Sequence, residues 1–265
     1  MKLTSLTVSA FTAGAMISTS FTAGAALIAY EGFDYPSNSA VVGQNGGTGW
    51  NGEWVAHNAD SPGLVVNGTG LSYPNFPSTG LSVTPGGYVS ARRSFSSSNL
   101  TEGVLYMSML IQPLSNTRTG IRISNNSVGQ NSSTFQAAFG IFDGVAAIVD
   151  SFGNNTKLAQ SSAVTTGVTH LLVARIDLTT DTIRLYLDPT PGGAEPTTAS
   201  TSYTWSTDRL NNIGSITAGG LSGGNGGQYD EIRVGTTFAA VAVPEPSSVG
   251  LLALGAGLLA RRRRS

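Results

Sequence analysis

The side chains that could carry out acid–base or metal chemistry are few in this sequence. There are two histidines, His57 and His170, and no cysteine, so neither a thiol nucleophile nor a thiolate metal site can form. His57 has no second histidine near it in the sequence, and a zinc site is therefore not expected. His170 stands at the start of an expected strand, where we assign it a structural role.

Carboxylates could instead act as the acid and the nucleophile of a glycosidase, whose two carboxyl groups lie about 5 Å apart in retaining enzymes. Asp230 and Glu231 are adjacent on an expected strand, but neighbouring residues of a regular strand point to opposite faces. Glu31 and Asp34 flank an early strand and lack a partner at a suitable spacing. The sequence therefore predicts no catalytic residues, and the protein is not expected to be an enzyme.

Aromatic residues point more directly to a binding role. Trp50 and Trp54 follow a glycine-rich segment, residues 46–49, and Tyr35 stands in an earlier loop. An aromatic ring stacked on the face of a sugar ring would provide recognition of a glycan. We therefore take Trp50, Trp54 and Tyr35 as candidate glycan-binding residues. The alternative interpretation is that the tryptophans fill the ends of a sandwich core.

The composition narrows the class of protein. Charged residues make up 11% of the 265-residue chain, which contains 34 glycines, and this composition is poor in helix formers. Outside the two ends, nine basic residues stand against fourteen acidic ones, so the body lacks the basic surface that nucleic-acid binding needs. We expect no nucleic-acid partner. Because there are no cysteines, stability must come from packing.

Short apolar or alternating segments, separated by clusters of Gly, Asn, Pro and Ser, predict an all-β fold. The most regular pair is 170–177 and 182–187, whose alternation indicates one face on a core and one in water, as in an antiparallel sandwich. A second hairpin is expected to turn at Asp143-Gly144. The expected strands are 27–30, 64–66, 88–95, 104–112, 120–124, 135–142, 145–151, 170–177, 182–187, 213–218 and 228–234.

Residues 1–25 have the features of a secretory signal peptide. Lys2 precedes a stretch that is apolar with interspersed Thr and Ser, and the small residues Ala23 and Ala25 fit the signal peptidase pocket. We predict cleavage after Ala25, with a site a few residues later as the alternative. The competing interpretation is an N-terminal helix that belongs to the fold.

The other end of the chain carries an apolar segment that follows a Pro-Glu-Pro sequence and precedes four arginines. Pro244 and Pro246 disfavour helix in the residue before each, which keeps Pro244-Glu245-Pro246 extended and accessible. Residues 249–260 are apolar or glycine, and counting back to residue 240 gives about the 20 residues that a transmembrane helix needs. Four arginines, Arg261, Arg262, Arg263 and Arg264, follow as a cytoplasmic stop, which leaves the body in the periplasm. A buried core helix is the competing interpretation.

These features in this order resemble the PEP-CTERM sorting signal. Pro244, Glu245 and Pro246 match its motif residue by residue, and the resemblance covers residues 241–265. It implies recognition by an exosortase, a membrane cysteine-type transpeptidase, in a Gram-negative bacterium. It also implies transit through the inner membrane, followed by delivery to the cell surface or the extracellular matrix.

The order of the expected strands resembles the concanavalin A-like, laminin-G-type jelly roll. The segments AYEGFDYPSN, GQNGGTGWNGEW, THLLVARIDLTTDTIRLYLDP and QYDEIRVGTT carry this resemblance. It implies that the last strand pairs near the first, which hides the edges of both. Such domains often hold Ca²⁺, but there is no DxDxDG loop, so the metal site stays unassigned. Oxygen donors are available at Asp34, Asp143, Asp150 and Asp188.

The sequence thus predicts a signal peptide (1–25), a concanavalin A-like jelly-roll β-sandwich (26–240) and a sorting tail with a transmembrane helix (241–265). The predicted function is that of an exported, non-catalytic surface or matrix protein, handled by signal peptidase and an exosortase, that binds exopolysaccharide or another glycan. One alternative is a glycan-processing enzyme, a glycosidase or lyase, of the same fold. The other is a membrane protein that the tail anchors permanently.

Overall fold

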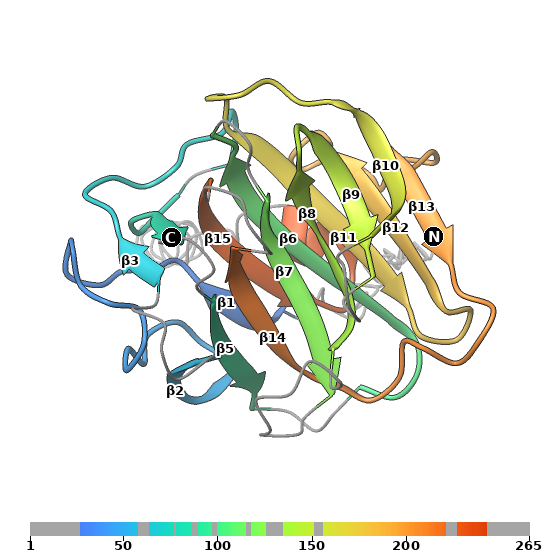
Figure 1. The fold of residues 1–265 in the computed structure, drawn as a ribbon, viewed down its shortest axis with the longest axis horizontal. Helices are drawn as coiled ribbons and strands as arrows, with labels where there is room; N and C mark the ends of the chain where they lie inside the picture. The colour runs from blue at the N-terminus through green and yellow to red at the C-terminus, as the bar shows by residue number, and fades with distance from the viewer. Residues whose placement is uncertain are drawn as a thin grey trace, which may run out of the picture.

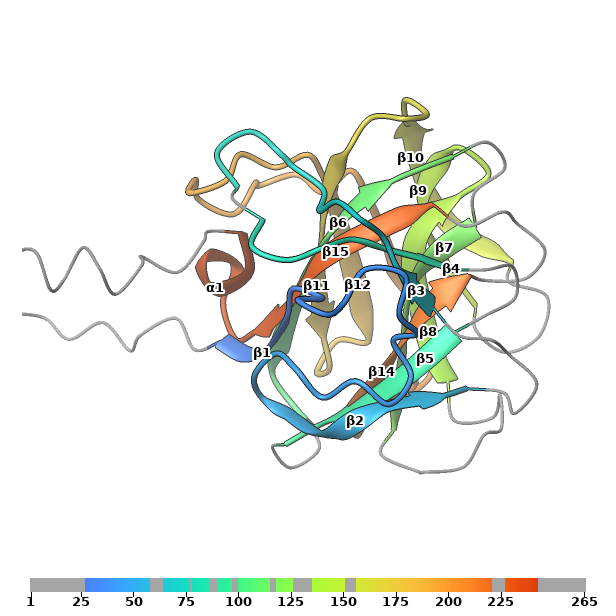
Figure 2. The same ribbon diagram turned by 90° about the vertical axis from the view of Figure 1, so that its left-hand side faces the viewer.

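Two antiparallel β-sheets pack face to face to form a β-sandwich (Figures 1 and 2). The computed structural model describes residues 27–57, 64–76, 78–85, 90–96, 100–114, 118–125, 135–150, 156–220 and 227–242. The first sheet has the order β13 (Thr201–Thr204), β12 (Thr182–Leu187), β11 (His170–Asp177), β6 (Val104–Gln112), β15 (Gln228–Gly235), β4 (Val83–Pro85) and β3 (Leu64–Val66), and β1 (Leu27–Glu31) also pairs with β15. The second sheet has the order β10 (Lys157–Ala163), β9 (Val145–Val149), β8 (Phe135–Phe142), β7 (Arg118–Asn125), β14 (Ile213–Gly220), β5 (Ser90–Phe95) and β2 (Trp50–Ala56).

The expected all-β sandwich is therefore confirmed, and each expected strand is present with ends shifted by at most a few residues. The expected hairpin turn also forms, with φ angles of 53° at Asp143 and 80° at Gly144. Strands β2, β4, β10 and β13 and the short helix α1 (Phe238–Ala242) were not expected. Three of these strands, β2, β10 and β13, lie at sheet edges, where few residues need to be apolar and the alternation is lost.

The core lies between the sheets and is built from alternate residues of the central strands. Met107 and Met109 of β6 belong to the same buried cluster as Ile121 and Ile123 of β7 and Phe139 of β8. All five side chains have no exposed surface. In each of these strands, the residues between the core positions therefore project from the outer face of the sandwich.

The outer face of the first sheet is covered as well. Figure 2 shows α1 on the side of this sheet that faces away from the second one. The ring of Phe238 packs edge-on against Tyr106 at 6.3 Å and Tyr186 at 5.9 Å between centroids. The hydroxyl of Ser108 donates a hydrogen bond to the carbonyl of Val241 at 2.7 Å. Because both of its faces are covered, β6 has an unbroken run of buried residues.

Strand β1 pairs antiparallel with β15, and this confirms the pairing of first and last strands that the jelly-roll resemblance implies. Leu27 lies opposite Gly235, three residues before α1 begins. The described chain therefore starts and ends at one corner of the sandwich, as Figure 2 shows.

A glycine pair brings β7 and β8 of the second sheet close together. Gly120 is paired with Gly140. A Cβ atom on Gly120 would come within 2.8 Å of the Cα of Gly140 and would overlap the carbonyl oxygen of Phe139. Since both obstacles are backbone atoms, no side-chain rotation could make room.

Replacing Gly120 with alanine should therefore destabilise the protein by about 1–3 kcal/mol or more through overpacking. Gly68→Ala is the matched control, because the nearest atom to its added Cβ would be the Ser37 hydroxyl at 3.6 Å. Urea unfolding of both variants checks this. Equal unfolding midpoints for Gly120→Ala and the native protein would show that the two strands can separate at little cost.

Candidate functional site

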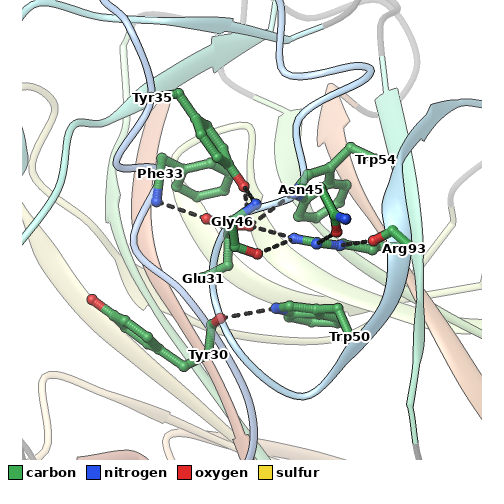
Figure 3. A network of polar contacts seen from close by, with 10 residues as sticks. Tyr30, Glu31, Phe33, Tyr35, Asn45, Gly46, Trp50, Trp54 and Arg93 are labelled. Atoms are coloured by element: carbon green, nitrogen blue, oxygen red, sulfur yellow. Dashed lines mark hydrogen bonds and ion pairs between the residues drawn. The ribbon is translucent and has the colours of Figure 1, made fainter.

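The predicted aromatic residues gather around a buried carboxylate, that of Glu31 at the end of β1 (Figure 3). One oxygen, Oε1, accepts a hydrogen bond from the backbone N–H of Phe33 at 2.9 Å. The other, Oε2, accepts from the hydroxyl of Tyr35 at 2.6 Å and from the indole N–H of Trp54 at 2.9 Å. The guanidinium of Arg93 also donates to Oε2, at 2.7 Å.

Arg93 links this carboxylate to the glycine-rich segment. Only 2% of Arg93 is exposed. Its Nη1 also donates to the carbonyl of Gly46 at 2.8 Å, and its Nη2 donates to the side-chain oxygen of Asn45 at 2.7 Å. Its Nε donates to the carbonyl of Gly52 at 2.9 Å. The buried ion pair is thus surrounded by fixed hydrogen-bond partners, which offset the cost of taking both charges out of water.

The glycines of this segment allow it to lie directly against β1. Thr48 exchanges two backbone hydrogen bonds of 2.9 Å with Tyr30. A Cβ on Gly49, whose φ is 77°, would come within 2.8 Å of the Cα of Ala29. The indole N–H of Trp50 donates to the carbonyl of Tyr30 at 2.9 Å. The glycine-rich segment is therefore required by the packing against β1.

This geometry rules out a glycan-binding role for two of the three candidate aromatic residues, Trp54 and Tyr35. Trp54 lies on strand β2, has no exposed surface, and donates its only N–H to Glu31. Tyr35 is 8% exposed and is held by the same carboxylate. Neither ring can offer a face to a sugar, and for Trp54 the core-filling interpretation is confirmed. Trp50 is partly buried, with one ring face stacked on Phe95 at 5.6 Å.

Glu31→Gln should destabilise the protein by about 3–5 kcal/mol, because it leaves Arg93 buried without a counter-charge. Asp143→Asn is the control, since it removes an ion pair with Arg118 in which both side chains are more than a third exposed. That change should cost less than about 1 kcal/mol. Urea unfolding measures both values, and similar losses in the two variants would contradict the structural role of Glu31.

A second pair of buried carboxylates, Asp230 and Glu231, breaks the rule of alternation in β15. Glu231 has a φ of 52°, and the register with β6 shifts between Asp230 and Arg233. This bulge turns both carboxylates toward one segment, residues 70–80. The expectation that the two would point to opposite faces is therefore wrong, because it assumed a regular strand.

Every oxygen of this pair is used to hold protein groups. Asp230 accepts hydrogen bonds from the N–H of Leu71 at 2.9 Å, the hydroxyl of Ser78 at 3.0 Å, and the N–H of Glu231 at 2.7 Å. Glu231 accepts from the N–H of Thr79 at 2.9 Å and from Arg233 at 2.8 Å. Both carboxylates have no exposed surface, so the arrangement supports the segment and leaves no open side for a substrate.

Burial raises the pKa of Asp230 to about 7, and the nearby charge of Glu231 adds to this. Because the folded pKa exceeds the unfolded one, this group's contribution to stability is fully present at acidic pH. It is lost as the pH rises through about 7.

Asp230→Asn tests this effect, since titrating groups that are distant from Asp230 cancel in the difference between the native protein and the variant. The free energy of unfolding of the native protein, minus that of the variant, should fall by about 2 kcal/mol between pH 5 and pH 8. Urea unfolding at several pH values measures it. A difference that does not fall over this range would contradict the raised pKa of Asp230.

Of the predicted oxygen donors, Asp34 is exposed, and the other three occupy separate structural pairs. His170 begins β11 and contacts the carboxylate of Asp188 at 2.7 Å. Asp143 pairs with Arg118, and Asp150 pairs with Arg209. Among the described residues, no three His, Asp or Glu side chains come together in a way that could hold a metal ion.

A polar face that the sequence analysis did not single out lies on the outside of the second sheet. The register pairs Arg92 of β5 with Thr217 of β14, and Thr217 with Arg122 of β7. Their neighbours in the strands include core residues on the opposite side, such as Ile121 and Ile216. The signal was present in part, because polar residues alternate with apolar ones over 121–124 of β7 and 215–218 of β14, whereas Arg92, Arg93 and Ser94 of β5 are consecutive polar residues.

His57 and Phe135 border this polar face. The ring of Phe135 lies 4.9 Å from the ring of His57 and 4.9 Å from the guanidinium of Arg122. Burial lowers the pKa of His57 to about 4, and the charges of Arg122 and Arg92 contribute. His57 is therefore neutral near pH 7, and the positive charge of this face resides on the arginines.

Comparisons with solved structures found the following similarities. A protein of unknown function from Shewanella oneidensis MR-1 is 17% identical, with a TM-score of 0.46 over 80% of this chain and 87% of that one. Domain 4 of AbnA, a GH43 extracellular arabinanase from Geobacillus stearothermophilus, solved with arabinotriose, is 14% identical, with a TM-score of 0.45 over 80% of this chain and 92% of that one. Lectin II from Ulex europaeus is 12% identical, with a TM-score of 0.40 over 60% of this chain and 88% of that one.

A search of curated proteins found no match. No helix in the described part of the chain is long and apolar enough to cross a membrane. The predicted signal peptide (1–25), the sorting residues Pro244, Glu245 and Pro246, the apolar stretch and the terminal arginines all lie outside the described residues. At the level of sequence, residues 242–264 match the PEP-CTERM protein-sorting motif, and the chain carries this motif at its C-terminus.

Proposed function

We propose that this protein is an exported, non-catalytic surface protein that an exosortase delivers and whose β-sandwich binds an extracellular glycan. The observation that carries the proposal is the match of residues 242–264 to the PEP-CTERM sorting motif. In this proposal, residues 1–25 direct export and are removed, residues 26–240 form the working domain, and residues 241–265 direct sorting.

The sequence of the tail supports its role as a processed signal. Pro244 and Pro246 keep the motif extended, so that an enzyme can bind its backbone. The apolar residues 249–260, with four arginines after them, would hold the tail in the inner membrane with the body on the periplasmic side. The exosortase would then cut at or near Pro244-Glu245-Pro246 and release the body to the surface.

The described body supports access to the tail. The last described residue, Ala242, is the first residue of the matched motif. The start of β1 lies beside the end of β15. Signal peptidase and exosortase would therefore act at the same corner of the folded domain, and neither cleavage would disturb the sheets.

The proposal of a non-catalytic body is supported by the contacts of its buried carboxylates. Glu31, Asp230 and Glu231 each accept hydrogen bonds from several protein groups and have no exposed surface. A general acid or a nucleophile must instead reach the substrate within about 3 Å. These carboxylates act as anchors for the chain around them.

Replacing Pro244, Glu245 and Pro246 together with alanine should block sorting in the native host. The uncut chain should accumulate in the inner membrane, while Ser247→Ala with Ser248→Ala, which directly follow Pro246, should leave delivery unchanged. Immunoblots of membrane and surface fractions measure this. If mass spectrometry of native surface material finds peptides that continue past Pro246, the tail is a permanent anchor and the proposed processing is wrong.

A further inference from the structure

We propose that the docked helix α1 hides the sorting motif from the exosortase, and that α1 must leave the first sheet before the tail can be cut. The inference rests on the proposed function, because it takes the tail to be processed at or near Pro244-Glu245-Pro246. It adds a control over when that processing takes place.

The helix ends where the motif begins. The match to the PEP-CTERM motif starts at residue 242, and Ala242 is also the last residue of α1 and has no exposed surface. Pro244 follows two residues later, so its Cα can lie at most about 7 Å from the Cα of Ala242. While α1 is docked, the motif is therefore held close to the surface of the domain.

The residues on the N-terminal side of the motif are bound to the first sheet. Four of the five residues of α1 are buried, in a cluster with outward-facing residues of β6, β11 and β12. The ring of Phe238 packs edge-on against Tyr106 and Tyr186, and Ser108 donates to the carbonyl of Val241 at 2.7 Å. Enzymes that cut a folded chain act on locally opened segments. The docked state of α1 therefore resists cleavage beside it.

The helix can leave the sheet without unfolding of the domain. Its five residues are too few to form a stable helix in water, so release turns α1 into extended chain. Only Phe238 and Val241 bury large apolar side chains, because the other three residues are alanines. Local opening of so small a segment needs less free energy than global unfolding. Once released, the chain from Gly235 at the end of β15 to Pro244 could extend to about 30 Å.

The strength of docking would set the rate of processing. When opening and closing are fast relative to cleavage, the rate of cleavage follows the fraction of molecules in which the segment is open. The surface that receives α1 is made of three strands, β6, β11 and β12, and exists only once the first sheet has formed. The delay therefore applies to folded molecules, which stay attached to the membrane until α1 is released.

The test measures the rate at which the full chain is cut in the native host, by pulse-chase labelling and immunoprecipitation. Ser108→Ala leaves the carbonyl of Val241 without its partner, and should raise this rate about fivefold or more. Ser108 is far from the motif in sequence, so the change leaves the residues that the exosortase reads intact. Phe238→Ala should act in the same direction. Ile121→Val is the matched control, because it weakens the core on the second sheet without touching α1, and should leave the rate unchanged.

An insertion separates hiding of the motif from other effects of α1. Six Gly and Ser residues placed between Ala242 and Val243 would let the motif move up to about 20 Å further from the docked helix. This chain should be cut faster than the native one. Adding Ser108→Ala to the insertion should then give no further increase, because both changes act on the same step. Increases that multiply would mean that Ser108 acts in some other way.

The outcomes separate this inference from the proposed function. If Ser108→Ala and the insertion are cut at the native rate, or if Ile121→Val is cut as fast as Ser108→Ala, processing by the exosortase stands and the role of α1 is wrong. If the native chain is not cut, or is cut equally well after Pro244, Glu245 and Pro246 are replaced with alanine, both the proposed processing and this inference are wrong. If Phe238→Ala does not fold, Ser108→Ala and the insertion still decide the question.

Discussion

The ion pair between Glu31 and Arg93 determines how the first part of the chain is built. An unpaired charge at this depth would destabilise the fold by several kcal/mol, so polar groups around the pair must form hydrogen bonds to both charges. The indole of Trp54, the hydroxyl of Tyr35 and the carbonyls of Gly46 and Gly52 do so. Each comes from a different part of residues 31–54, and the shared partner fixes their relative positions. A segment rich in glycine, with few apolar residues of its own, is thereby ordered by polar contacts.

The two sheets differ in what lies on their outer faces. The first sheet is covered by α1 and by segments that Asp230 and Glu231 hold in place. The outer face of the second sheet carries arginine, serine and threonine in register. The polar side chains of the second sheet are themselves largely buried, with Thr217 and Ser215 each 1% exposed.

The central strands could be predicted because alternation is a direct consequence of having one face in a core. The edge strands β2, β10 and β13 could not, since an exposed edge places little demand on side-chain type. The role of Trp54, which lies on β2, depends on Glu31, which is distant in sequence. The joint orientation of Asp230 and Glu231 depends on the left-handed backbone at Glu231, which no sequence pattern signals. The polar residues of β7 and β14 were readable from alternation, but those of β5 were not, since Arg92, Arg93 and Ser94 are consecutive. Only the register aligns them in rows.

The position of β15 has a mechanical consequence. The chain leaves the domain through this strand, which is hydrogen-bonded to β6 on one side and to β1 and β4 on the other. A pull on the C-terminal end would first have to lift α1 from the sheet and then shear a central strand past both neighbours. Resistance to such force is governed by the rate of unfolding, and an edge strand at the exit would peel away one bond at a time. While a domain of this design is still attached through its tail, it can bear load without unravelling from the point of attachment.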